Sequence, residues 1–199
     1  MTPVPALDLS PRLRDAVADD VPAIVDLIQR FAAAGKMLPR TPRDVLRALP
    51  RFVVMDSAGC VVACGGLRVY SRELAEVVSL AVDEDWQGRG IGAVIVDHLL
   101  ERAETMGIAR IFAMTLREPF FHRQGFRTVP RAWIPEKEAA DCRSCARCSG
   151  CREIAVWRDL AVRPAMSGWT AASPRPGHVV VASSSRYGPP RHSSRPSRA

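Results

Sequence analysis

The chain has 199 residues, enough for one domain with a buried core. No apolar run approaches the roughly 18 residues that span a bilayer, and residues 1–9 lack a basic region followed by an apolar one, so we expect a cytoplasmic protein with no membrane partner. Six positive charges of the net +7 lie beyond residue 160, where no Asp or Glu occurs: Arg163, Arg175, Arg186, Arg191, Arg195 and Arg198. Because the rest of the chain is close to neutral, we expect no nucleic-acid partner.

Composition divides the chain into three parts. Residues 1–10 are expected to form an N-terminal extension, residues 11–162 a folded domain and residues 163–199 a tail. The tail is rich in Pro, Ser, Gly and Arg, and its short apolar patch at 179–181 cannot bury enough surface to offset the entropy of ordering the chain. We therefore predict a disordered tail. Contact of this basic segment with acidic partners is a second interpretation that its composition leaves open.

Apolar periodicity predicts alternating strands and helices in the folded domain. The predicted elements, in chain order, are a strand at 12–17, a helix from Asp19 or Asp20 to Gly35, a helix at 42–49, a hairpin of strands 52–56 and 61–70, a strand at 76–82, a helix at 90–106, a strand at 108–115, a short helix at 119–123, and strands near 127–133 and 154–159. This order predicts an α+β fold, with helices on both faces of a mixed central sheet.

A glycine-rich turn follows the strand at 76–82 and opens the longest predicted helix. Its sequence is Gln87-Gly88-Arg89-Gly90-Ile91-Gly92. Glycines leave backbone N–H groups uncovered, the helix N-terminus adds its dipole and Arg89 adds a positive charge, so the turn suits a pyrophosphate.

Spacing separates the possible ligands of this turn. A nucleoside-triphosphate P-loop needs Lys and Ser or Thr after the last glycine, where Ala93 and Val94 stand. A dinucleotide fingerprint needs an acidic residue about 20 positions later, where the next strand ends in Thr115-Leu116-Arg117. A turn with no ligand is the remaining structural alternative.

The turn and its surroundings resemble the GNAT (Gcn5-related) acetyltransferases. The matching residues are the Q/R-x-x-G-x-G/A turn at 87–92, the strand at 75–82 and the segment Phe120-Phe121-His122-Arg123-Gln124-Gly125-Phe126. The resemblance implies the GNAT fold, acetyl-CoA as co-substrate and no required metal. It also implies that Leu80, Ala81 and Val82 pair through their backbone with the pantetheine arm, and that Gln87, Gly88, Arg89, Gly90, Ile91 and Gly92 bind the pyrophosphate.

The resemblance places a catalytic glutamate at Glu76. A carboxylate there has a chemical purpose, because an amine attacks a thioester only after losing its proton. Strand alternation predicts that Glu76 shares one face with Val78, Leu80 and Val82. A glutamate that merely faces solvent at a sheet edge is the structural alternative. The tyrosine that protonates the leaving thiolate in many GNAT enzymes is replaced by Phe121, and Tyr70, Ser79 and Thr115 are weaker candidates for that task.

Several further patches resemble the short N-acetylglutamate synthases, which open arginine biosynthesis. They are 35–41, 64–68, 75–77, 120–126, and Asp141-Cys142-x-x-Cys145 with Cys151-x-Glu153. The resemblance implies transfer of acetyl to the α-amino group of L-glutamate. Longer members also carry an amino-acid-kinase-like domain, which we do not expect in this chain. A homodimer is one assembly that the sequence allows.

An acidic acceptor calls for arginine, whose planar guanidinium matches a carboxylate with two hydrogen bonds. Arg40 is the first choice, Arg68 and Arg117 follow, and Lys36 and Arg123 come last. Each of them is alternatively a solvated surface charge. Because arginine binds the shared α-carboxylate, L-glutamate and L-glutamine both stay open, as does another small amine or a protein amine.

Four cysteines form C-x-x-C-x-x-C-x-x-C at Cys142, Cys145, Cys148 and Cys151. This spacing suggests a function of another class, a metal-binding or redox module. Uniform two-residue gaps place all four on one short segment, unlike the two separate knuckles of a zinc ribbon, and only Cys60 and Cys64 remain as further ligands. We therefore expect structural thiols without disulfides, with a structural metal or a redox cluster as alternatives.

Overall fold

The computed structural model describes residues 10–142, 145 and 150–161. They form a seven-stranded sheet in the order β1-β2-β3-β4-β5-β7-β6, in which β4 and β5 are parallel and the other neighbours antiparallel. The predicted α+β fold with a mixed sheet is confirmed. The strands are β1 (Arg12–Asp15), β2 (Phe52–Ser57), β3 (Cys60–Val69), β4 (Leu74–Val82), β5 (Arg110–Thr115), β6 (Arg127–Thr128) and β7 (Ile154–Asp159).

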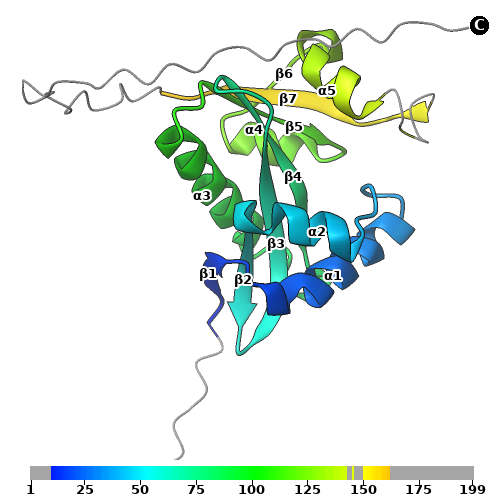
Figure 1. The fold of residues 1–199 in the computed structure, drawn as a ribbon, viewed down its shortest axis with the longest axis vertical. Helices are drawn as coiled ribbons and strands as arrows, with labels where there is room; N and C mark the ends of the chain where they lie inside the picture. The colour runs from blue at the N-terminus through cyan, green and yellow to red at the C-terminus, as the bar shows by residue number, and fades with distance from the viewer. Residues whose placement is uncertain (1–9, 143–144, 146–149, 162–199) are drawn as a thin grey trace, which may run out of the picture. The chain divides into compact units, whose positions relative to one another are not determined.

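Helices cover both faces of this sheet (Figure 1). On one face, α1 (Val21–Ala33) and α2 (Pro42–Ala48) bury Ile24, Leu27 and Val45 against β2 and β3. On the other face, α3 (Ile91–Thr105) buries Ile95 and Leu99. The short helices are η1 (Ala18–Asp20), η2 (Leu49–Arg51), η3 (Glu84–Trp86), α4 (Glu118–Arg123), η4 (Arg131–Trp133) and α5 (Pro135–Ala140).

Most helices and strands of the structure begin and end within two residues of the bounds that turn signals predicted from the sequence. The hairpin of β2 and β3 is confirmed, with Gly59 in its turn at φ +82°, and the predicted strand at 154–159 matches β7. The strand predicted near 127–133 is wrong beyond Thr128, because Pro130 introduces the 3-10 turn η4. Helix α5 was not predicted at all.

Two adjacent glycines in β3 leave room for close neighbours, a helix side chain beside Gly65 and a β2 ring beside Gly66. A Cβ on Gly65 would lie 2.6 Å from Ile95 Cγ2 of α3, and a Cβ on Gly66 would lie 2.9 Å from the Phe52 ring. Both positions are buried. Gly65 therefore allows α3 to pack closely on β3, and Gly66 allows the Phe52 ring of β2 to lie against β3.

A β-bulge at Ser79 interrupts β4. Ser79 has φ +54°, rare for a residue with a side chain, and three steps along β4 from Val78 to Ala81 match two along β3 from Gly66 to Cys64. The extra residue reverses the side-chain alternation. The prediction that Glu76, Val78, Leu80 and Val82 share one face is therefore wrong. Glu76 and Val78 lie on the α2 face, whereas Leu80 and Val82 pack against the α3 cluster.

The parallel ladder between β4 and β5 is short. It joins Leu74–Glu76 to Arg110–Phe112 and then stops, although β4 continues to Val82 and β5 to Thr115. The two strands therefore separate immediately after Glu76. Their facing edges have no strand between them in the part of the chain that the structure describes.

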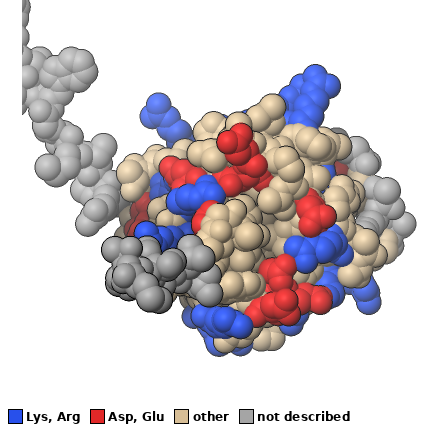
Figure 2. All heavy atoms as spheres, turned by 90° about the horizontal axis from the view of Figure 1, so that it is seen from below, with Lys and Arg blue, Asp and Glu red and all other residues tan. Residues whose placement is uncertain are grey.

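The surface of the described residues carries charges of both signs. Figure 2 shows acidic and basic side chains interspersed over the face it presents. No helix among the described residues is long and apolar enough to cross a membrane. The predicted tail at 163–199 and all of the predicted extension except Ser10 lie outside the described residues.

Candidate active site

The glycine turn lies at the N-terminus of α3. Gly88 and Gly90 have φ +75° and +80°, and a Cβ on either would meet nothing within 4 Å. Among the described residues, no acceptor is found for the main-chain N–H groups from Gly88 to Gly92, whereas Ala93 N–H and Val94 N–H donate to the Gly90 carbonyl. The exposed Arg89 guanidinium stacks 4.9 Å from the Trp86 ring. Open N–H donors at a helix N-terminus fit a diphosphate.

The stretch from Leu80 to Val82 connects the bulge to this turn. Ala81 and Val82 pair with Cys64 and Ala63 of β3, and the Gln87 side-chain amide donates to the Val82 carbonyl at 3.0 Å. The opposite edge of the stretch faces the separation between β4 and β5. An extended ligand with amide groups could pair along such an edge as an added strand does.

Glu76 lies buried at the last rung of the β4–β5 ladder, with 3% of its surface exposed. The Tyr70 hydroxyl donates to its Oε2 at 2.8 Å, and Lys137 Nζ contacts Oε1 at 2.7 Å and Oε2 at 3.0 Å. Burial raises the pKa of Glu76, and the charge and hydrogen bonds of Lys137 oppose this only in part. The solvent-facing alternative for Glu76 is thereby wrong.

Two further charges extend the contacts of Glu76 into a network. Lys137 Nζ also contacts Asp141 Oδ2 at 2.8 Å, and the same oxygen accepts from Arg68 Nη1 at 2.5 Å. Burial acts to raise the pKa of Asp141, but the hydrogen bonds from Arg68 and Lys137 outweigh it and lower the pKa to about 2. Burial likewise acts to lower the pKa of Lys137, and the charge of Glu76 reverses that effect. The network therefore alternates in charge from Arg68 to Glu76.

A cavity of about 460 Å³ lies between α2 and the β3–β4 pair. Four arginines line it, and of these only Arg68 has an ion-pair partner among the described residues. Arg40 donates from Nε to the Ser79 hydroxyl at 3.3 Å. The lining residues are Arg40, Arg47, Arg51, Arg68, Asp44, Asp141, Val45, Ala48, Phe52, Leu67 and Val78. Their net positive charge suits an anionic ligand.

Arg117, the third arginine proposed from the sequence, does not line this cavity. It is exposed and precedes α4, and its backbone N–H donates to the Thr115 hydroxyl at 2.8 Å. The structure brings Arg40 and Arg68 together and leaves Arg117 apart. Lys36 is also exposed and pairs with Glu84 at 3.5 Å.

The model of the Acetyltransferase (GNAT) family matches residues 22–126. The chain belongs to the GNAT acetyltransferase family. It is thus an N-acetyltransferase of a family that uses acetyl-CoA.

Among curated relatives, an uncharacterized N-acetyltransferase of Chlorobaculum tepidum is 32% identical over 157 residues, covering 79% of this chain and 100% of the relative. An amino-acid acetyltransferase of Mycobacterium tuberculosis is 38% identical over 126 residues, covering 61% of this chain and 71% of the relative. An amino-acid acetyltransferase of Ralstonia nicotianae is 37% identical over 126 residues, and the match covers 62% of this chain but only 28% of that longer protein.

Two solved structures resemble this GNAT chain over most of its length. The Mycobacterium tuberculosis protein Rv2747, in complex with CoA and NLQ, matches with a TM-score of 0.66 and 28% identity, covering 76% of this chain and 100% of that one. The N-acetylglutamate synthase of Neisseria gonorrhoeae, complexed with coenzyme A and N-acetyl-glutamate, matches with a TM-score of 0.69 and 25% identity, covering 76% of this chain and 35% of that one.

The GNAT tyrosine position is filled by a core residue in this chain. Phe121 is 5% exposed and stacks edge-on against Phe120 at 5.0 Å and Phe126 at 5.2 Å. Among the alternatives, the Tyr70 hydroxyl is engaged with Glu76, and burial raises the pKa of this phenol. Ser79 is engaged with Arg40, as described above.

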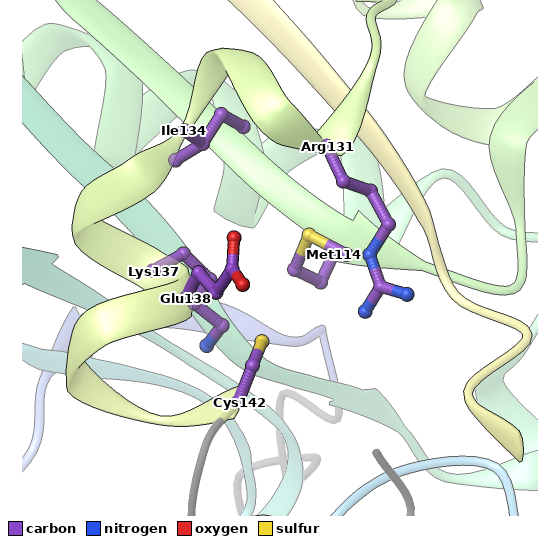
Figure 3. Close-up of a pocket in the computed structure, with 6 residues that line it drawn as sticks. All are labelled: Met114, Arg131, Ile134, Lys137, Glu138 and Cys142. Carbon is purple, nitrogen blue, oxygen red and sulfur yellow. The ribbon is translucent and has the colours of Figure 1, made fainter. Parts of the chain in front are cut away.

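The cysteine segment borders a second, smaller cavity of about 210 Å³ (Figure 3). Arg131 and Met114 face Glu138 and Cys142 across it, and Arg131 Nη2 lies 3.1 Å from Cys151 Sγ. Cys148 lies outside the described residues. Among those that are described, no group of three or more His, Cys, Asp or Glu side chains is arranged to hold a metal ion.

Sequence reasoning missed four residues that shape this site. Lys137 and Asp141 come from α5 and the position directly after it, 61 and 73 residues from their partners Glu76 and Arg68. Arg47 and Arg51 line the cavity from α2 and η2. Two signals were available: the four-residue spacing of Arg47 and Arg51, and the place of Asp141 in the patch that resembles the short synthases.

Proposed function

We propose that this chain transfers acetyl from acetyl-CoA to the α-amino group of L-glutamate, as an N-acetylglutamate synthase does. The observation that carries the proposal is the cavity lined by Arg40, Arg47, Arg51 and Arg68 on the same face of β4 as Glu76. Glutamate brings two carboxylates, and paired arginines bind carboxylates through two hydrogen bonds each. The relatives named amino-acid acetyltransferase support the same substrate class.

The proposed chemistry assigns one task to each part of the site. The open N–H groups from Gly88 to Gly92 hold the diphosphate, and the edge of Leu80–Val82 pairs with the extended arm of the co-substrate. Glu76 accepts a proton from the acceptor's ammonium group, directly or through a water. The freed amine then forms a bond with the acetyl carbon as the carbon–sulfur bond breaks, and CoA leaves as a thiolate.

A raised pKa suits Glu76 to this task. A base works best when its pKa approaches the working pH, and burial moves the pKa of this carboxyl upward from its ordinary value. No tyrosine is needed for the leaving group, because a thiol with a pKa near 8.5 leaves readily as the thiolate. Direct transfer without an acetyl-enzyme is therefore sufficient.

L-glutamine is a second acceptor that the same α-carboxylate contact would admit. Only the contacts of the side-chain carboxylate separate the two, and a site built for a charged group rejects a neutral analogue strongly. The surplus of arginine over acidic residues in the cavity favours glutamate. Within the cell, we propose a place at the start of arginine biosynthesis, with the reaction in the cytoplasm.

The experiment is a CoA-release assay across the amino acids, with acetyl-CoA binding followed in parallel by calorimetry. Glu76→Gln and Arg40→Ala should each lower glutamate turnover steeply while acetyl-CoA binding persists. Arg43→Ala is the matched control, because Arg43 is an exposed arginine of α2 that does not line the cavity. Preference for an uncharged or cationic amine, or undiminished glutamate turnover by Arg40→Ala, would refute the proposal.

A further inference from the structure

One carboxylate oxygen joins the acceptor cavity to the proposed base. Asp141 Oδ2 lies 2.5 Å from Arg68 Nη1 and 2.8 Å from Lys137 Nζ, and Lys137 Nζ in turn contacts both oxygens of Glu76. A lysine ammonium has three protons to donate, and here two carboxylates share them. Whatever changes the charge beside Asp141 therefore changes how strongly Lys137 holds Glu76.

Exposure decreases along the network from the cavity inward. The side chains of Arg68 and Asp141 are 34% and 28% exposed, whereas those of Lys137 and Glu76 are 15% and 3% exposed. The outer pair can therefore exchange partners with a ligand that enters the cavity, while the inner pair is shielded from water. The exposed end belongs to a lining arginine, and the buried end to the base.

Glu76 as seen here is poorly placed to accept a proton. Lys137 Nζ occupies both of its oxygens, and the Tyr70 hydroxyl donates to one of them. A carboxylate paired with an ammonium is also a weaker base, since the positive charge favours its ionised form. An acceptor that reaches the cavity must therefore weaken the Lys137 contact before its own proton can leave.

We propose that the Asp141 carboxylate binds Arg68 in the place of a substrate carboxylate. An acidic acceptor that binds Arg68 then displaces Asp141, and Lys137 moves from Glu76 toward Asp141. Once Arg68 is bound to substrate, Asp141 loses one cationic partner and attracts Lys137 more strongly. Glu76 then loses most of its ion pair and accepts the ammonium proton. Asp141 and Lys137 are positioning residues in this scheme, which rests on the proposed function.

The scheme adds a source of specificity. An amine without a carboxylate cannot displace Asp141 from Arg68, so it meets a base that Lys137 still occupies. The site would then discriminate at proton removal as well as at binding, which is a form of induced fit. The predicted discrimination falls on kcat and not on KM alone.

The decisive variant is Asp141→Asn, assayed with glutamate and acetyl-CoA. Removing the internal competitor should lower KM for glutamate by roughly fivefold, the scale of one partly exposed ion pair. It should also lower kcat, because Lys137 then has Glu76 as its remaining anionic partner. A merely structural defect would raise KM, so the joint fall is diagnostic. Glu136→Gln, on the exposed side of α5, is the control and should change neither constant.

A double-mutant cycle tests whether the effect runs through Arg68. In an Arg68→Leu background, Asp141→Asn should no longer lower KM, because no arginine remains for the two carboxylates to compete for. If KM is unchanged or higher in Asp141→Asn alone, the inference fails while the proposed function stands. If the wild type does not turn over glutamate, both fail.

A second variant covers the case in which Asp141→Asn does not fold. The charged and titratable groups around Glu76 are Tyr70, Lys137, Asp141 and Arg68. Lys137→Met should move the acid limb of kcat/KM to higher pH, because that limb reports the pKa of Glu76 in the free enzyme. The acid limb of kcat reports the enzyme–substrate complex and should stay nearly in place. An equal movement of both limbs would mean that Lys137 stays on Glu76 during turnover, and would overturn the inference.

Discussion

Removing the positive charge of Lys137 should shift the acid limb of the kcat/KM profile to higher pH. Glu76 must be deprotonated to accept a proton, and burial already raises its pKa. Lys137 works in the opposite direction, by its charge and by hydrogen bonds to both carboxylate oxygens at 2.7 and 3.0 Å. In Lys137→Met this opposing effect is lost, so the pKa of Glu76 rises further and activity disappears earlier as the pH falls.

The size of the effect follows from burial and from the competing carboxylate. An opposite charge within about 4–6 Å lowers a carboxyl pKa by roughly 1–3 units. Lys137 shares its charge with Asp141 at 2.8 Å, which places the effect at the lower end of that range. At the acid end of the profile, we expect kcat/KM of Lys137→Met to be about tenfold below that of the wild type at the same pH, each relative to its own plateau, which corresponds to about 1.4 kcal/mol.

The assay is steady-state CoA release with glutamate, measured across the acid half of the pH range. Lys36→Met is the matched control, because Lys36 is the chain's other lysine and forms an exposed pair with Glu84. Lys137→Arg retains the charge and should keep the wild-type limb. Superimposable kcat/KM profiles for Lys137→Met and the wild type would refute the assignment of Glu76 as the base coupled to Lys137.

Two glycine substitutions, each paired with a glycine control, test the turn and the packing of α3. Gly90→Ala and Gly107→Ala each place a Cβ at a positive φ, at opposite ends of α3, where nothing lies within 4 Å. Because of this backbone strain, each should lower the free energy of unfolding by roughly 1 kcal/mol. Only Gly90→Ala should also weaken acetyl-CoA binding, by about tenfold in a calorimetric titration. Equal weakening by both would assign the effect to helix strain. Gly65→Ala forces a Cβ to 2.6 Å from Ile95 Cγ2 and should lower the free energy of unfolding in urea by about 1–3 kcal/mol, whereas Gly150→Ala, in open space, should not. A Gly65→Ala protein as stable as the wild type would contradict the packing described for β3.

Features with a local physical cause were predictable from the sequence. A glycine run between a strand and a helix requires positive φ at particular positions, and Gly88 and Gly90 adopt it. The turn at Gly59 and the apolar run of β7 are equally local. The resemblance to the GNAT family added the position of Glu76 on β4, which local patterns alone would not have distinguished from an edge residue.

The partners of Glu76 depended on contacts that no local pattern encodes. Helix α5 has only six residues and is anchored by Ile134, which precedes it and is 2% exposed, so its apolar periodicity is too short to read. From the sequence alone, Lys137 is therefore indistinguishable from the solvent-exposed charges beside it. Its role follows only from the fold, which brings α5 over the face of β4 that carries Glu76.

The bulge at Ser79 decides how one strand serves both halves of the site. Without it, strict alternation would turn the Leu80 and Val82 side chains toward α1 and α2, into the space where Ala81 now packs, and would remove Leu80 from its place beside Gly65 and α3. With it, Val78 lines the arginine-lined cavity and Glu76 lies buried on the same face, while Leu80 and Val82 pack on the other face. The β4–β5 ladder ends at Glu76, so the backbone edge of Leu80–Val82 stays open beside the proposed base. In the proposed mechanism, β4 offers a carboxylate to the acceptor and a pairing edge to the co-substrate only because its alternation is broken between them.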